Sequence, residues 1–387
     1  MMKYFIIAGE ASGDLHGSNL IRGIKSIDPG SEIRCWGGDM MQQAGAHLLK
    51  HYKESAVMGF VEVLLKSGTI IRNLSSCKRE ILEYKPDLIV LIDYPGFNMK
   101  IAEFAHENSI PVFYYIAPKV WAWKEGRIKK LKKYVERLFI IFPFEIEYFR
   151  SHGIEAIYNG NPLLDSIANY RYAGESRREF CKRHSLDEEK EIVALLAGSR
   201  KNEIKYLLPK MAELSKDYDN YRFLLAAAPS TDIGLYNSII ASHGGANITI
   251  IKDETYSVLR HAKGAIISSG TASLEAALIG TPQVVCYGGN EISYRIARAV
   301  VKLKYISLAN LILDKPIFKE LIQHDCTVKN MERELDRILT DKACVEAMKE
   351  DYARVKEILG GEGASVKVAQ SMVREYKKLK ADDHRGI

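Results

Sequence analysis

Short, unbroken apolar runs alternate with helical patterns along most of this chain of 387 residues. The runs are rich in β-branched residues and apolar on both faces, as in strands buried inside a parallel sheet. Ten runs have this character: Tyr4–Ala8, Glu32–Trp36, Leu88–Ile92, Pro111–Ile116, Arg137–Ile141, Ile192–Leu196, Tyr221–Ala226, Ile248–Ile250, Gly264–Ile267 and Pro282–Tyr287. Helical patterns lie between them, at Ser18–Ser26, Thr69–Tyr84, Met99–His106, Ile128–Tyr134, Ile204–Lys216 and Leu274–Ile279. The alternation predicts doubly wound α/β domains.

Ten strands exceed what one ordinary sheet of this kind holds, so we expect two sheets in two domains. The boundary is expected near Asn159–Arg183, which gives domains at residues 1–170 and 171–363. Ligands bind at the carboxyl ends of parallel strands, and two domains of this kind present those ends to a central cleft. The C-terminal segment Glu332–Lys380 is expected to be helical apart from the glycine cluster at residues 360–363.

Charge, cysteine content and hydropathy limit the partners and the compartment that we expect for this chain. The formal net charge of +6 is spread along the chain, which favours anionic partners without requiring nucleic acid. The densest basic run, from Lys124 to Arg137, fits a solvated helix face, and it also fits contact with a phosphorylated substrate or an anionic membrane surface. Six scattered cysteines without a CxxC pair indicate a reduced, cytosolic protein. No run approaches the roughly 18 apolar residues of a transmembrane helix, so we expect at most association with a membrane surface.

The segment Ser268–Glu275 follows a predicted strand and has the pattern of a turn of small residues opening a helix. Free amides and the helix dipole at such a start attract anions. Glu275 lies one turn further on, within reach of sugar hydroxyls when the helix start holds a phosphate. The pattern therefore favours a nucleotide diphosphate. The alternative is an ordinary helix capped by Thr271 or Ser269.

Two more strand ends carry glycine-rich segments. Gly9–Gly17 follows the first strand, and it is expected to form a turn in which Glu10, Ser12 and Asp14 offer polar contacts. Gly198-Ser199-Arg200 follows a strand of the second half, where Arg200 either clamps a phosphate or pairs with Glu203. Neither segment is GxGxxG or a Walker motif.

Asp93 closes the apolar run Leu88–Ile92. A carboxylate at this end of a buried strand is a candidate general base, and the alternative is an Asp that caps the following turn. Nearby, Trp121 and Trp123 form either packing core or an aromatic wall against sugar or acyl chains. The histidines have no HExxH spacing. Asp217-Tyr218-Asp219 is formally DxD, but it lies in a polar loop between a helix and a strand, where Asp usually serves turn geometry, so no metal and no cofactor are expected.

Segments in a fixed order, from about residue 3 to residue 330, resemble one protein family. They are Gly9–Asp14, Gly59–Val63, Asp93 with Phe97-Asn98, Pro118–Trp123, Asn159–Pro162, Gly198–Arg200, Ser269–Glu275 and Tyr305–Asn310. Each motif is weak by itself, but the ordered set closely resembles lipid-A-disaccharide synthases.

The resemblance implies an inverting glycosyltransferase of the GT-B type, with two Rossmann-like domains facing a central cleft. It would transfer 2,3-diacylglucosamine from UDP-2,3-diacylglucosamine to 2,3-diacylglucosamine 1-phosphate, giving a β-1,6-linked disaccharide 1-phosphate of lipid A and UDP. Residues 1–170 would bind the acceptor and face the membrane, and residues 171–363 would bind the donor. The final helix, about 364–380, would pack back on the first domain.

The resemblance also implies roles for single residues. Asp93 would remove the proton of the acceptor 6-hydroxyl. Arg200, Ser269, Gly270 and Thr271 would stabilise charge on the departing UDP in place of a metal. Ribose would be bound by Glu275. The remaining implied positions are Asn310, Glu320 and Gln323 in the donor pocket and Glu10, Ser12 and Gly13 on the acceptor side.

The substrates of that family carry acyl chains, and the stretch Val57–Lys66 is apolar on more than one helical stripe. We therefore expect an acyl groove that rests on the cytoplasmic face of the inner membrane. Its residues would be Val57, Met58, Phe60, Val61, Leu64 and Leu65. The alternative is ordinary core with a mobile loop.

Two other functions remain open. A UDP-sugar epimerase of the same fold would act on one soluble sugar nucleotide without an acyl-lined region, and a non-catalytic nucleotide-sugar binding module would tolerate loss of Asp93. An NAD dehydrogenase is disfavoured because neither half has GxGxxG followed by an acidic residue. The oligomeric state stays open, with a homodimer among the alternatives.

Overall fold

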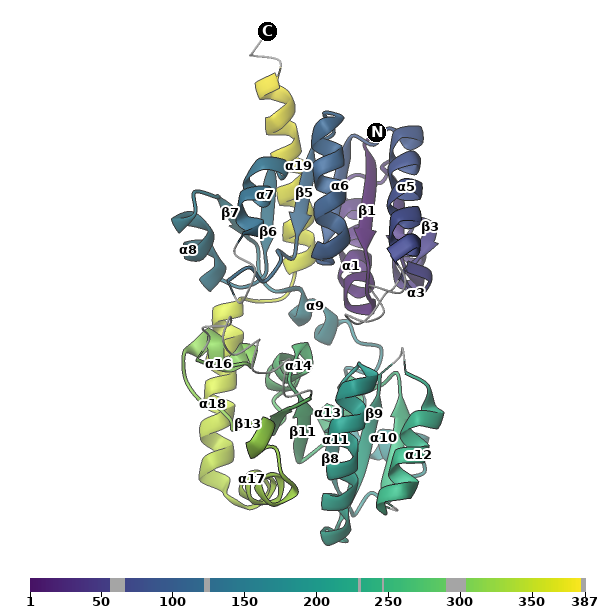
Figure 1. Cartoon of the computed structure of the whole chain (residues 1–387). Helices are drawn as coiled ribbons and strands as arrows, with labels where there is room; N and C mark the ends of the chain where they lie inside the picture. The colour runs from purple at the N-terminus through teal and green to yellow at the C-terminus, as the bar shows by residue number, and fades with distance from the viewer. Residues whose placement is uncertain (56–66, 122–125, 229–230, 246, 290–303, 384–387) are drawn as a thin grey trace. The chain divides into compact units, whose positions relative to one another are not determined.

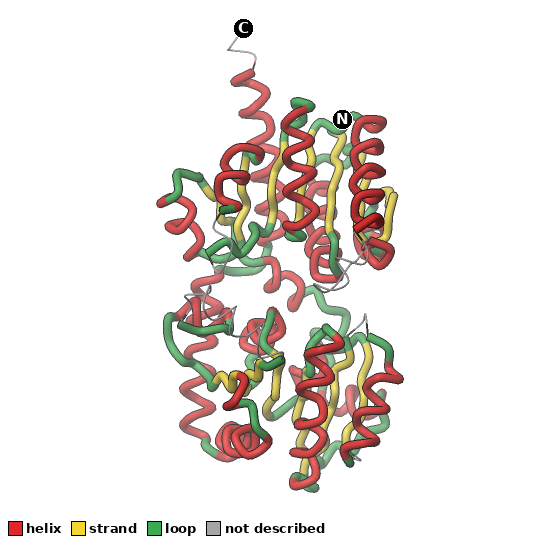
Figure 2. Tube along the Cα trace, in the orientation of Figure 1, coloured by secondary structure: helices red, strands yellow, loops and turns green. Residues whose placement is uncertain are grey.

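The computed structural model describes residues 1–55, 67–121, 126–228, 231–245, 247–289 and 304–383. The chain divides into two compact units, Met1–Ser166 with Leu359–Ile387, and Ile167–Ile358 (Figure 1). Each unit is an α/β structure built on one parallel sheet, as the alternating strand and helix colours of Figure 2 show. No helix among the described residues is both long enough and apolar enough to cross a membrane.

The first unit has a seven-stranded sheet in the order β3-β2-β1-β4-β5-β6-β7. Its strands are β1 (Lys3–Ala8), β2 (Glu32–Gly37), β3 (His47–His51), β4 (Leu88–Ile92), β5 (Val112–Tyr115), β6 (Arg137–Ile140) and β7 (Ala156–Tyr158). Its helices are α1 (Ala11–Ile27), α2 (Asp39–Gln43), α3 (Tyr52–Ser55), α5 (Ser67–Tyr84), α6 (Pro95–Glu107), α7 (Arg127–Tyr134), α8 (Phe144–Ser151), α9 (Pro162–Ala168) and α19 (Ala364–Asp383). All five residues of the central β4 are buried, because helices cover both faces of the sheet.

The C-terminal helix α19 packs against α1 in this unit. Gly23 allows the close approach, since a Cβ there would lie 3.0 Å from both the Cβ of Ala369 and the carbonyl oxygen of Ser365. The carboxylate of Asp165 holds the start of α19 by accepting the amide of Ser365 at 2.7 Å. The predicted break at the glycine cluster is present between α18 (Lys342–Leu359) and α19, where Gly360 and Gly363 have φ of 82° and 87°.

The second unit has a six-stranded sheet in the order β10-β9-β8-β11-β12-β13. Its strands are β8 (Glu191–Leu196), β9 (Tyr221–Ala227), β10 (Ile248–Lys252), β11 (Gly264–Ser268), β12 (Gln283–Tyr287) and β13 (Glu320–Ile322). Its α-helices, besides α18, are α10 (Arg177–Arg183), α11 (Lys201–Leu214), α12 (Ile233–His243), α13 (Thr255–His261), α14 (Thr271–Ile279), α16 (Leu308–Leu313) and α17 (Val328–Thr340). Helix α11 contacts α12 and α17, whereas α14 contacts α13 and α16.

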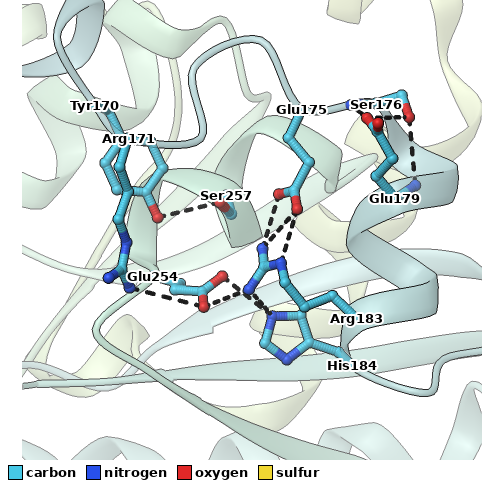
Figure 3. A network of polar contacts seen from close by, with 9 residues as sticks. All are labelled: Tyr170, Arg171, Glu175, Ser176, Glu179, Arg183, His184, Glu254 and Ser257. Carbon is cyan, nitrogen blue, oxygen red and sulfur yellow. Dashed lines mark hydrogen bonds and ion pairs between the residues drawn. The ribbon is translucent and has the colours of Figure 1, made fainter.

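A polar network fixes the segment that enters the second unit (Figure 3). Arg183 makes two hydrogen bonds of 2.8 Å to the carboxylate of Glu175 and also binds Glu254. Burial opposes ionisation of Glu254, but its bonds to Arg183 and His184 outweigh this and lower its pKa. A reciprocal capping box starts α10, the helix that ends at Arg183. It is formed by the side chains and amides of Ser176 and Glu179.

All ten predicted strands are present, with ends that shift by at most two residues. The sequence missed β3, β7 and β13, which lie at sheet edges. Edge strands bury less apolar surface, and β7 and β13 have only three residues each, so their apolar signal is short. The turn expected over Gly9–Gly17 was wrong, because α1 begins at Ala11.

Candidate functional site

Asp93 lies directly after β4, in a backbone conformation that is rare for non-glycine residues. Both Asp93 and Tyr94 have positive φ, 44° and 49°. The Asn98 amide donates to the carbonyl oxygens of Ile92 and Asp93 at 3.2 and 2.8 Å. The Tyr114 hydroxyl donates to the same Asp93 carbonyl at 2.6 Å. These bonds hold the backbone that carries the carboxylate, and they leave the carboxylate itself for other chemistry.

The environment of Asp93 raises its proton affinity. Burial raises the pKa of the carboxyl to about 6, and the negative charge of Glu10 adds to this shift. The positive charges of Lys119 and Arg127 and the amide of Tyr94 act in the opposite direction. A carboxylate with this pKa is ionised at neutral pH and is basic enough to take a proton from a hydroxyl as that group attacks.

Glu10, Ser12 and Gly13 lie where β1 passes into α1, at the strand next to β4. Glu10 and Ser12 are exposed. Gly13 is buried, and a Cβ there would lie 3.1 Å from the Cβ of Ala8, so glycine lets the helix start pack on the strand. Asp14 is buried, and its carboxylate accepts three amides of the turn that starts α2, including that of Gly38 at 2.8 Å, so its observed contacts hold that turn.

A second buried carboxyl lies at the same edge of this sheet. The carboxylate of Glu145, at the start of α8, accepts the indole N–H of Trp121 at 2.9 Å and the amide of Phe142 at 3.1 Å. Burial raises the pKa of Glu145 to about 7, although these donors and the charge of Lys119 oppose the shift. Trp121 is therefore tethered to the sheet, while Trp123 lies outside the described residues.

In the second unit, Arg200 follows β8 with its side chain two-thirds exposed. It pairs with Glu203 at 3.2 Å, and Glu203 also accepts the amides of Ser199 and Arg200. Gly198 has φ of 105°, and a Cβ there would lie 2.5 Å from the Glu203 carboxylate and 3.1 Å from Oγ of Ser268. The Arg200 loop therefore meets the end of the neighbouring strand β11.

The end of β11 passes into α14 through Ser269 and Gly270. The Ser269 amide donates to the Cys286 carbonyl at 2.9 Å, which fixes the turn on β12. Gly270 has φ of 157° and precedes the first helical residue, Thr271. The first amides of a helix have no partner within it, so Thr271 begins an anion-attracting helix start beside the Arg200 loop.

Glu275 lies in the second turn of α14. Its Oε1 accepts the hydroxyl of Tyr256 in α13 at 2.8 Å. Burial raises the pKa of Glu275, and the hydrogen bond from Tyr256 opposes this shift. The residue as a whole is half-buried.

Asn310 and Glu320 bind each other, with the Asn310 amide donating to the Glu320 carboxylate at 3.0 Å. Glu320 also accepts the amide of Ser307 at 2.9 Å, just before α16, and Asn310 accepts that of Ile317 at 3.0 Å. Asn310 is fully buried. Both side chains therefore hold the backbone around α16 in place.

The side chain of Gln323 binds the backbone of Gly289, in the loop after β12. Its side-chain oxygen accepts the Gly289 amide at 2.8 Å, and its nitrogen donates to the Gly289 carbonyl at 3.3 Å. Its own main-chain carbonyl accepts the Tyr206 hydroxyl at 3.2 Å. The segment 290–303 that follows Gly289 lies outside the described residues.

The structure thus brings the site residues into two groups, one at the carboxyl edge of each sheet. Their roles stay predictions. The six residues expected to contact acyl chains, Val57, Met58, Phe60, Val61, Leu64 and Leu65, lie outside the described residues. The sequence missed Tyr114, Tyr256, Lys119 and Glu145, because each acts on a residue that lies elsewhere in the chain and no local motif marks it.

Comparison with known proteins places the chain in a family. The family model for lipid-A-disaccharide synthetase matches residues 4–374. The lipid-A-disaccharide synthase of Geobacter metallireducens is 36% identical over 372 residues, 95% of each chain. That of Syntrophus aciditrophicus is 36% identical over 377 residues, 96% of this chain and 97% of its own.

Solved structures share the fold at low sequence identity. MnaA of S. aureus with UDP aligns with a TM-score of 0.67 and 12% identity, covering 98% of both chains. A UDP-GlcNAc 2-epimerase from Neisseria meningitidis aligns with a TM-score of 0.61 and 13% identity, covering 96% of this chain and all of that one. These likenesses confirm two Rossmann-like domains of the GT-B type. From its sequence relatives, the chain belongs to the lipid-A-disaccharide synthetase family.

Proposed function

We propose that this chain transfers 2,3-diacylglucosamine from UDP-2,3-diacylglucosamine to the 6-hydroxyl of 2,3-diacylglucosamine 1-phosphate, with inversion. The products are the β-1,6-linked lipid A disaccharide 1-phosphate and UDP. Family membership supports the reaction. The observation that carries the chemistry is the Asp93 carboxylate, which is ionised at neutral pH and lies on a backbone fixed by Asn98 and Tyr114.

In this mechanism, Asp93 accepts the proton of the 6-hydroxyl while that oxygen bonds to the anomeric carbon of the donor. The bond from that carbon to the diphosphate breaks, and UDP leaves with the electron pair. Arg200 keeps donors beyond its bond to Glu203, and with Ser269, Gly270 and Thr271 it stabilises the negative charge on UDP. Glu275 accepts hydrogen bonds from the ribose.

Other residues of the proposal act by holding loops or by forming the acceptor side. Asn310, Glu320 and Gln323 shape the donor pocket through their contacts with the backbone of neighbouring loops. Glu10 and Ser12 line the acceptor side, next to Asp93.

The decisive experiment measures UDP release from the donor with and without the monosaccharide 1-phosphate acceptor, in detergent. Wild-type protein is expected to release UDP only with acceptor, and Asp93→Asn to lose this release while still binding UDP. Release without acceptor dependence contradicts the transfer and favours epimerisation, and binding without any turnover favours a binding module. Full activity of Asp93→Asn would place the base elsewhere.

We also propose that residues 57–65 hold the acyl chains and bring the protein to the cytoplasmic face of the inner membrane. Val61→Glu and Leu64→Glu should abolish pelleting with vesicles of anionic lipid and leave thermal unfolding unchanged. Ile358→Glu is the matched control, because Ile358 is an exposed apolar residue of α18 in the second unit. Unchanged pelleting of the first two variants would contradict the proposal.

A further inference from the structure

The carboxylate of Glu275 has one hydrogen-bond partner among the described residues, the hydroxyl of Tyr256. The bond of 2.8 Å uses Oε1 and joins α14 to α13. A carboxylate has two oxygens and several acceptor positions, so this bond leaves Oε2 able to accept further donors. Both residues are half-buried, and Glu275 lies on the helix whose start is the proposed anion site.

Tyr256 is itself held between two anchored neighbours. Glu254, just before α13, is bound by Arg183, and Ser257 shares a hydrogen bond of 3.1 Å with the hydroxyl of Tyr170 (Figure 3). The ring of Tyr170 also packs edge-on against the ring of Tyr256, with centroids 5.3 Å apart. Tyr256 therefore presents its hydroxyl from a fixed position, which is what a group that orients another side chain requires.

We propose that Tyr256 is a positioning residue for nucleoside recognition, which orients the Glu275 carboxylate to accept hydrogen bonds from the two ribose hydroxyls of the UDP-sugar. The proposal rests on the proposed donor site, in which Glu275 binds ribose. Tyr256 touches Glu275 and not the reacting atoms, so its loss should weaken donor binding and leave the chemical step unchanged.

The hydrogen bond has a second consequence that supports this role. Burial favours the neutral form of Glu275, whereas the donor from Tyr256 favours the charged form. A charged carboxylate is a stronger acceptor for hydroxyl groups than a neutral one. Removing the Tyr256 hydroxyl therefore removes both the orientation and part of the acceptor strength.

The test measures binding of UDP and of 2′-deoxy-UDP to the full chain by calorimetry. Wild-type protein is expected to prefer UDP. Tyr256→Phe should lower UDP affinity by roughly tenfold, the usual effect of one hydrogen bond to a charged group, with a smaller loss for 2′-deoxy-UDP, which keeps only the 3′-hydroxyl. In turnover, KM for the donor should rise and kcat should stay the same.

Tyr218→Phe is the matched control, because it removes a tyrosine hydroxyl that binds Glu332 and Asp336 of α17 and neither Tyr256 nor Glu275. This variant should keep the wild-type preference for UDP over 2′-deoxy-UDP. In a Glu275→Gln background, Tyr256→Phe should have almost no further effect on UDP binding, because the two residues act through one contact.

Two results overturn the proposal, and they are distinguishable. If Glu275→Gln loses the preference for UDP while Tyr256→Phe keeps it, Glu275 binds ribose without help from Tyr256. If the wild type and Glu275→Gln bind UDP and 2′-deoxy-UDP alike, Glu275 is not in the ribose site, and the donor assignment fails with the inference.

Discussion

The hydroxyl of Tyr114 donates to the main-chain carbonyl of Asp93 at 2.6 Å, from the strand that neighbours β4. The bond contacts the backbone and not the carboxylate. It therefore restrains the strained turn after β4 without consuming an acceptor position of the proposed base. Asn98 likewise binds the main-chain carbonyl of Asp93 and not its carboxylate.

The proposed base predicts an acidic limb in the pH profile of kcat/KM. A general base must be ionised, so activity should fall as the pH drops through about 6, the pKa of Asp93. Glu10→Gln removes a negative charge that raises this pKa, so the limb should move to lower pH. Lys119→Met removes a positive charge that lowers it, so the limb should move to higher pH.

Both shifts should be modest, since Glu10 and Lys119 are exposed and water and salt screen their fields. The position of the limb is the readout, because substrate contacts at either residue change the height of the profile only. If the acidic limb shifted in the same direction in both variants, Asp93 would not be the titrating group.

Asn98→Ala should reduce both stability and activity. The buried carbonyl of Ile92 and the partly buried carbonyl of Asp93 each lose a donor, which is expected to cost about 1–3 kcal/mol of the free energy of unfolding. Asn108→Ala is the control at the exposed end of the same helix, where the amide donates to Phe104 at 2.8 Å. Chemical denaturation should separate the two, and equal losses of stability would contradict a special role for the turn at Asp93.

Two of the three glycines of α1, Gly17 and Gly23, predict opposite outcomes of the same substitution. Gly23→Ala meets the Ala369 Cβ and the Ser365 carbonyl of α19 at 3.0 Å each, and backbone cannot move aside. It should cost about 1–3 kcal/mol, as overpacking usually does. Gly17→Ala meets the flexible side chain of Met41 at 2.7 Å, and it gains up to about 1 kcal/mol in helix propensity.

Hydrogen exchange of α19 is the measurement that distinguishes these effects. Amides of residues 364–383 should exchange faster in Gly23→Ala because the helix is pushed off α1. Those of Gly17→Ala should match the wild type. Slow exchange of α19 in both variants would show that the helix is held from elsewhere, for example by the Asp165 cap on Ser365.

The sequence predicted the elements that carry an apolar signal and missed those that depend on distant partners. The run Leu88–Ile92 is continuous and fully buried, so both its strand and the polar residue that ends it could be predicted. Tyr256 gives no such signal, because it lies 19 residues before Glu275 and meets it only when α13 and α14 pack together. Asp14 looked available for a ligand, because its three amide donors come from the turn after β2.

The carboxyl of Glu145 predicts a change near neutral pH that is independent of turnover. Its Oε1 accepts the indole N–H of Trp121, and burial raises its pKa from 4.5 to about 7. Because the folded state binds this proton more tightly than the unfolded state does, the stability contribution is fully present below about pH 4.5. It is lost as the pH rises through about 7.

Protonation of Glu145 weakens the acceptor of the Trp121 indole, so tryptophan fluorescence should titrate with a midpoint near pH 7. The transition should disappear in Glu145→Gln, which has no proton to gain. Trp121→Phe is the second control, because it removes the reporter and keeps the carboxyl. A transition that persists in Trp121→Phe would belong to another tryptophan and would contradict the assignment to Glu145.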